Sequence, residues 1–169
     1  LFERKKTQNE IYAAFTGDVH VGSEKFQERA FLKFIDFLNG KIKTNTDIEK
    51  IKYLFIVGDL VDGVGVYPGQ DKELKIKSVE DQYEKAAELI SMIRKDIKVI
   101  ICPGNHDAVR IMEPQPMLNE KYAWPLYDLK NVILTTNPAT INIASTKDFN
   151  GLNVLIYHGY GFNYYANNV

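Results

Sequence analysis

The chain has 169 residues, with 22 acidic and 21 basic side chains and a formal net charge of −1. This length suffices for one domain that buries its own hydrophobic core without disulfides or structural metal ions. The balanced charge excludes a global basic field that recruits nucleic acid, although a local site can still bind a phosphodiester through metal ions.

The only cysteine, Cys102, excludes an internal disulfide and lies in an apolar run. We therefore expect a small buried side chain and a reducing, cytoplasmic compartment. No apolar run approaches the ~18 residues that cross a bilayer, and no signal peptide is recognisable, so we expect a soluble protein without membrane contact. The chain begins at Leu1 rather than at Met, which indicates a piece excised from a longer polypeptide.

The first two thirds of the chain predict alternating strands and helices. A polar linker over residues 1–10 leads into strands at residues 11–16, 52–57 and 98–102. Helical periodicity follows Ser23 and Ser78, which we expect to be the N-caps of two amphipathic helices, and residues 63–77 form a long loop. This alternation predicts parallel βαβ units, with aromatic side chains such as Phe15 and Phe55 in the core.

The pattern changes after residue 108, where prolines interrupt regular structure. Short apolar runs at 132–134, 140–143 and 153–157 predict further strands, the last two as an antiparallel hairpin. We therefore expect one α/β domain over residues 11–169. The aromatic residues of the segment 160–165 could stack on nucleic-acid bases or serve in core or interface packing, and the sequence favours neither reading.

Three polar motifs directly follow predicted strands: Gly17-Asp18-Val19-His20, Gly58-Asp59-Leu60-Val61-Asp62 and Gly104-Asn105-His106-Asp107. The third histidine of the chain, His158, ends another apolar run. Open α/β sheets gather their ligand-binding groups at the carboxyl ends of strands, where all three histidines are expected. Each motif alone could be a polar turn or a helix cap. Their succession in this order, with His158, favours a metal site.

The residue types predict which groups bind metal. The expected ligands are Asp18, His20, Asp59, Asn105 and His158, with Asp59 bridging two cations. Carboxylate oxygens mixed with imidazole nitrogens suit Mn²⁺, Fe or Zn²⁺ better than Mg²⁺. Two cations ~3.5–4 Å apart clamp a phosphoryl group and hold a hydroxide for in-line attack.

Two further residues of the motifs are expected to act in catalysis. His106 follows Asn105 directly, so its side chain is better placed to face the substrate than to bind the same ion, and it could protonate the leaving oxygen or stabilise charge. Asp62 could fix the tautomer of His106 by a hydrogen bond. Asp62 and Asp107 could instead only cap or bridge turns. Gly17, Gly58 and Gly104 precede the expected ligands, where unusual dihedrals or close backbone approach favour glycine.

The order of these motifs resembles that of the calcineurin-like metallophosphoesterase superfamily. The resemblance implies a layered α/β/β/α-type fold, truncated here. It assigns Asp18, His20 and Asp59 to one metal, and Asp59, Asn105 and His158 to the other. The final Gly-x-His motif of that superfamily is absent from these 169 residues, so each metal could lack a ligand.

Within the superfamily, Pro103 to Arg110 followed by Glu113-Pro114-Gln115-Pro116 resembles the small subunit of archaeal family D DNA polymerase. That resemblance implies a 3′→5′ proofreading exonuclease with two divalent cations, Mn²⁺ first among them. It also implies DNA 3′ ends, single-stranded or mismatched, as substrate and a large polymerase subunit as partner. The alternatives are a generic phosphodiesterase or phosphatase, and a non-enzymatic subunit that docks the large subunit.

Overall fold

Four parallel strands form the central sheet in the computed structural model, which describes residues 9–168. In spatial order they are β1 (Tyr12–Thr16), β2 (Ile51–Val57), β3 (Lys98–Cys102) and β4 (Val132–Leu134). The parallel βαβ pattern predicted from the sequence is confirmed. The central strands β2 and β3 are apolar almost throughout, as expected for strands that are covered on both faces.

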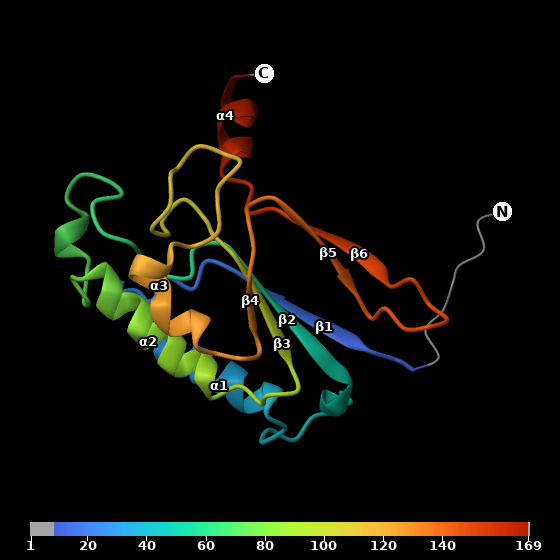
Figure 1. The fold of residues 1–169 in the computed structure, drawn as a ribbon. Coiled ribbons are helices and arrows are strands. Elements are labelled where there is room, and N and C mark those ends of the chain that lie inside the picture. The colour runs from blue at the N-terminus through green and yellow to red at the C-terminus, as the bar shows by residue number, and fades with distance from the viewer. Residues whose placement is uncertain (1–8, 169) are drawn as a thin grey trace.

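Three helices cover one face of this sheet, as Figure 1 shows: α1 (Glu28–Leu38), α2 (Val79–Ser91) and α3 (Glu120–Tyr127). Their apolar sides and the alternate residues Leu54 and Ile56 of β2 form the larger hydrophobic core. Two single 3₁₀ turns, η1 (Ile48–Lys50) and η2 (Gln70–Lys72), lie in the connections. This core fixes the strands whose carboxyl ends carry the polar motifs.

An antiparallel hairpin covers the other face of the sheet. It consists of β5 (Ala139–Ile143) and β6 (Leu152–Ile156), as the sequence predicts. A second, smaller core of Phe55, Ile100, Cys102 and Ile156 lies between the hairpin and the sheet, and Cys102 is fully buried. The layers are therefore helix, sheet, sheet, and residues 9–168 form no outer helical layer on the hairpin side.

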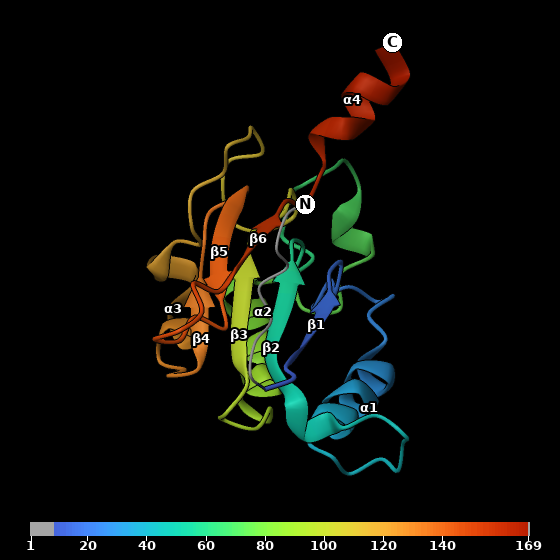
Figure 2. The ribbon, with the colours of Figure 1, turned by 90° about the vertical axis from the view of Figure 1, so that its right-hand side faces the viewer.

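The last described helix, α4 (Gly161–Asn168), extends away from the layers beyond the carboxyl ends of the strands (Figure 2). Tyr160, Phe162, Tyr164 and Tyr165 in this segment are all exposed. No helix among residues 9–168 is long and apolar enough to cross a membrane.

Two local expectations were wrong. Ser23 is not an N-cap, because α1 begins only at Glu28 after Gln27, and Ser23 instead pairs with Leu74 in an isolated bridge. Phe15 is 56% exposed, because β1 is an edge strand that the hairpin leaves uncovered, and its ring stacks on Phe55 at 4.7 Å. Ser78 does cap α2, since its side chain accepts a hydrogen bond from the Asp81 N–H. Residues 1–8 of the expected linker and Val169 lie outside the described residues.

Candidate metal centre

The polar motifs meet at one edge of the parallel sheet, on the loops that follow β1, β2 and β3, with His158 just beyond β6. Asp18, His20 and Asp59 have φ angles of 50°, 52° and 50°, in the left-handed region that residues with a Cβ rarely adopt. Strained backbone of this kind is retained where the surrounding structure holds a side chain in a required direction. Three of the expected ligands therefore lie on backbone that is shaped for a site.

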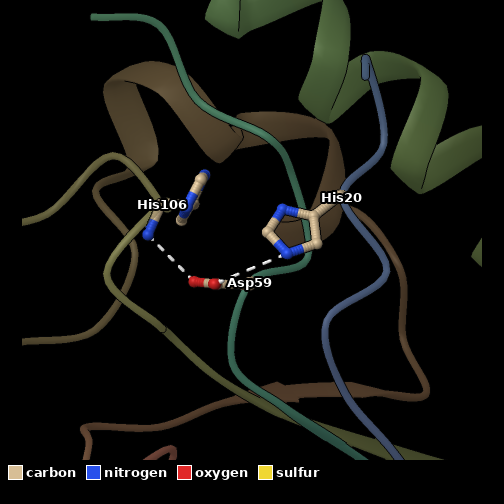
Figure 3. Close-up of side chains that lie close together, drawn as sticks. All are labelled: His20, Asp59 and His106. Carbon is tan, nitrogen blue, oxygen red and sulfur yellow. Dashed lines mark hydrogen bonds and ion pairs between the residues drawn. The ribbon is translucent and has the colours of Figure 1, made fainter. Parts of the chain in front are cut away.

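The first group of side chains surrounds His20. Its Nε2 atom lies 3.7 Å from Asp59 Oδ2 and 3.9 Å from Asp18 Oδ1. Figure 3 shows His20 and His106 on either side of Asp59. The distances from His20 to Asp59 and Asp18 exceed those of direct hydrogen bonds, so an ion has room between these three side chains.

The second group surrounds His158. Its Nε2 atom lies 3.0 Å from Asn105 Oδ1 and 3.4 Å from Asp59 Oδ2. Asp18, Asp59 and His158 also each offer one ligand atom within 4.8 Å of the others. Asp59 therefore belongs to both groups, and this residue is only 3% exposed. The structure brings all five expected ligands together, from loops that are far apart in the sequence.

The electrostatics of the cluster fit divalent cations. Among residues 9–168, every ion pair of Asp18, Asp59 and Asp62 is made with a histidine and none with lysine or arginine. Burial raises the pKa of Asp59, but hydrogen bonds from His158 and from the His106 N–H outweigh it and lower that pKa overall. The same carboxylate raises the pKa of His158 to about 9. The site thus attracts positive charge, and its oxygen and imidazole donors suit Mn²⁺, Fe or Zn²⁺.

His106 lies closer to the ligands than the sequence suggests. Its backbone N–H donates to Asp59 Oδ1 at 2.9 Å, and its ring packs edge-on against that of His20, with centroids 4.6 Å apart. His20, Asp59 and His106 each offer one ligand atom within 4.8 Å of the others. The ring of His106 also lines a cavity beside the centre. Its position is therefore compatible with contact to a substrate or to a cation.

Asp62 has a different partner from the expected one. The His106 Nδ1–H donates to the backbone carbonyl of Asp62 at 2.8 Å, whereas the Asp62 carboxylate is 4.0 Å away. That carboxylate lies 3.1 Å from His20 Nδ1 and accepts a hydrogen bond from Gln70 at 3.0 Å. The Asp62 main chain thus fixes the His106 tautomer, whereas its carboxylate lies beside His20 Nδ1 without a hydrogen bond.

Close packing requires all three motif glycines, and a Cβ on Gly17 would lie 2.7 Å from the backbone oxygen of Val57. A Cβ on Gly104 would overlap Asp59 Oδ1, and a Cβ on Gly58 would overlap the ring of His158. Gly58 also has a φ of 82°. Gly58 and Gly104 therefore confirm the expectation that glycine allows backbone to approach the site, and each touches a ligand of the second group.

Asp107 braces the loops and does not enter the ligand cluster. Its buried carboxylate accepts hydrogen bonds from the backbone N–H groups of Gly104, Leu60 and Val61 and from the hydroxyl of Tyr83. Burial raises the pKa of Asp107 to about 6, against the opposing effect of these donors. Its contacts tie the loop after β3 to the loop after β2.

Gln115 and Asn137 form a support that was not foreseen from the sequence. The Gln115 amide donates to the carbonyl of Gly104 at 3.0 Å and accepts from Asn137 Nδ2 at 2.7 Å. Asn137 Oδ1 in turn accepts from the backbone N–H of His158 at 2.9 Å. This buried pair links the segments that carry Asn105 and His158. The only sequence signal was the Glu-Pro-Gln-Pro run, which gives Gln115 no structural role by itself.

Comparison with known proteins agrees with this geometry. The family model described as calcineurin-like phosphoesterase matches residues 12–168. The chain is 43% identical over 161 residues to the DNA polymerase II small subunit of Methanothermobacter thermautotrophicus, covering 94% of this chain and 32% of the relative. It is 45% identical over 166 residues to the protein of that name from Pyrococcus furiosus, covering 95% and 26%.

A third relative, the DNA polymerase II small subunit of Methanocaldococcus jannaschii, is 45% identical over 163 residues, which are 95% of this chain and 26% of the relative. The chain therefore spans about a quarter to a third of the length of these curated relatives. The family match extends over nearly all described elements, from β1 to α4. The chain belongs to the calcineurin-like phosphoesterase family.

Proposed function

We propose that this domain hydrolyses phosphodiester bonds of DNA with two divalent cations, as a 3′→5′ exonuclease. The observation that carries the proposal is the position of Asp59 between two groups of ligands, one around His20 and the other around His158. One carboxylate shared by two ligand groups can hold two cations close together. When bound, two such cations neutralise a phosphoryl group and activate water.

The protein residues have distinct parts in this proposal. Asp18, His20 and Asp59 would hold one cation, and Asp59, Asn105 and His158 the other. The His106 Nδ1–H is engaged by the carbonyl of Asp62, so the Nε2 atom remains for the substrate. As the imidazolium, His106 would carry a second proton on Nε2, which would stabilise negative charge on the phosphoryl oxygens or be donated to the leaving oxygen.

The substrate and the partner rest on similarity. The relatives are named DNA polymerase II small subunits, a name that supports DNA as the substrate and a large polymerase subunit as the partner. We propose 3′ ends, single-stranded or mismatched, as the form of DNA that is degraded, Mn²⁺ as the cation, and the cytoplasm as the place of action. The five predicted ligands lie together within residues 9–168, which favours an enzyme over a domain that serves only to dock the large subunit.

The test is nucleotide release from a 5′-labelled, mismatched primer by the full-length gene product with Mn²⁺. The wild type is compared with Asp59→Asn and His106→Ala. We expect a ladder of shortened primers from the wild type, and a loss on the order of 10²–10⁴-fold for His106→Ala. Asp59→Asn should lose both activity and Mn²⁺ affinity, measured by calorimetry.

The matched control is Asp96→Asn, which removes an exposed carboxylate paired with Lys52 at the opposite end of the sheet. It should leave the ladder unchanged. If the wild type binds two Mn²⁺ ions but releases no nucleotide from any primer, the exonuclease proposal fails. Docking of the large subunit would then be the better account.

A further inference from the structure

A cavity of about 560 Å³ borders the metal centre. One wall is polar and consists of the candidate site residues Asp18, His20, Asp62 and His106. The remaining walls come from the start of α1, from the segment that precedes it and from the loop between β2 and α2. A volume of this size lies in the range of ~300–1,000 Å³ that is typical of pockets for small organic ligands.

The wall contributed by α1 and by the segment that precedes it carries three phenylalanines beside the polar side chains of Ser23, Lys25 and Gln27. Phe26, Phe31 and Phe34 line the cavity, and neighbouring ring centroids in this row are 6.2 Å apart. All three rings are only half-buried, because they pack on the main core from one side. Their other side is therefore available to a flat ligand in the cavity.

Tyr67 adds an aromatic ring from the long loop. It is 38% exposed, lines the same cavity, and its ring centroid lies 6.1 Å from that of His106. Buried glutamines hold this loop in place: Gln70 accepts from the Val66 N–H and donates to the Asp62 carbonyl, and Gln82 accepts from the Gly63 N–H. The loop that carries Tyr67 is thus tied to the segment that carries Asp62.

Resting on the proposed function, we propose that this cavity binds the 3′-terminal nucleoside of the DNA strand. The base would lie against Tyr67 and the phenylalanine row while the adjacent phosphate lies at the metal centre. Every base has a π-face, so an aromatic wall accepts any of them, as an enzyme that removes successive terminal nucleotides requires. A pocket for one small ligand suits the terminal nucleoside better than a run of stacked bases.

Residues 160–165 are the other aromatic group that the sequence suggested for base stacking. Figure 2 shows that α4 carries this group away from the sheet. Phe162, Tyr164 and Tyr165 do not line the cavity beside His106. The contact with the base therefore falls to Tyr67, to Phe31 and Phe34 of α1, and to Phe26 in the segment that precedes α1.

The test compares two single-stranded oligonucleotides as substrates of the full-length gene product. One has a normal 3′-terminal nucleotide, and the other has an abasic tetrahydrofuran residue at that position. The readout is the KM for release of the first residue. We expect the abasic end to raise KM on the order of tenfold in the wild type, as loss of one stacked base does. Tyr67→Ala should raise KM similarly for the normal end and have little effect on the abasic end.

The matched control is Trp124→Ala, which removes an exposed aromatic ring of α3 that does not line the cavity. It should change neither KM. If Tyr67→Ala lowers kcat/KM equally for both oligonucleotides, Tyr67 acts only on loop structure, and the nucleoside pocket is refuted while the exonuclease stands.

Equilibrium binding of the same oligonucleotides, measured by fluorescence anisotropy, decides the inference even if the protein cleaves neither. A preference of the wild type for the normal end, lost in Tyr67→Ala, supports the pocket. Equal affinity of the wild type for both ends overturns it. Absence of cleavage with that preference intact would count against the proposed exonuclease alone.

Discussion

Replacing Gln115 by methionine should weaken the second group of ligands through the buried amide pair. Gln115 is 2% exposed and Asn137 is fully buried. Methionine has a similar volume, so the change removes hydrogen bonds without opening a large cavity. The buried carbonyl of Gly104, the Nδ2 of Asn137 and the partly buried carbonyl of Arg110 lose their partner.

The expected cost follows from the two fully buried groups, Gly104 O and Asn137 Nδ2. A buried polar group left without a partner costs about 1–3 kcal/mol, so Gln115→Met should lower the free energy of unfolding by about 2–6 kcal/mol. That is a large part of the ~5–15 kcal/mol available to a typical domain. Because the pair holds the segments of Asn105 and His158, Mn²⁺ affinity should also fall about 10–100-fold, as is usual for residues that orient ligands.

Urea unfolding and Mn²⁺ calorimetry of the full-length gene product measure the two effects. Asn131→Leu is the matched control, since Asn131 is also buried and donates to a backbone carbonyl, that of Ile97, but at the amino end of β4. It should lower stability and leave Mn²⁺ binding unchanged. Unchanged Mn²⁺ affinity in a destabilised Gln115→Met would refute the link to the ligands, and unchanged stability would refute the energetic reasoning.

Two further predictions concern the scaffold. Ser78→Ala removes the N-cap of α2 and should lower the free energy of unfolding, measured by urea denaturation, by about 0.5–2 kcal/mol. Ser91→Ala at the last residue of that helix should stay within ~0.5 kcal/mol, and an equal loss in both variants would contradict the capping role. Burial raises the pKa of Cys102 to about 12, so the thiol should remain unmodified by iodoacetamide at pH 8 until urea unfolds the protein. Mass spectrometry of the tryptic peptide checks this, and rapid alkylation of the native protein would contradict it.

The sequence predicted the parallel sheet and the edge on which the candidate site lies. Strand periodicity and capping are local properties, so β3 was predicted with its observed bounds and Ser78 was recognised as a cap. Helix α1 was predicted to begin too early, because Ser23 has the side chain of a cap but lies in a bridge with Leu74. The partner that decided this is about fifty residues away, beyond any local pattern.

The candidate ligands were predicted from residue type and from the topological rule that the carboxyl ends of parallel strands meet at one edge. The sequence did not predict which of these side chains contact one another. Asp62 contacts His20 with its carboxylate and His106 with its carbonyl, a distinction set by the direction of one side chain at a loop. Gln115 and Asn137 had no recognisable function until the fold placed them between Gly104 and His158.

The sequence by itself determined which chemistry meets at the sheet edge, because strand ends, glycines and metal-binding residue types are encoded within short segments. Only the tertiary structure decided which atoms face one another and which strand is an edge. It also decided that aromatic rings from α1, from the segment that precedes α1 and from the loop of Tyr67 share one cavity with His106. These features depend on contacts between residues tens of positions apart, which form only when the layers pack. Phe15 shows the difference: its apolar side chain predicted a core position, and the order of the strands left it exposed.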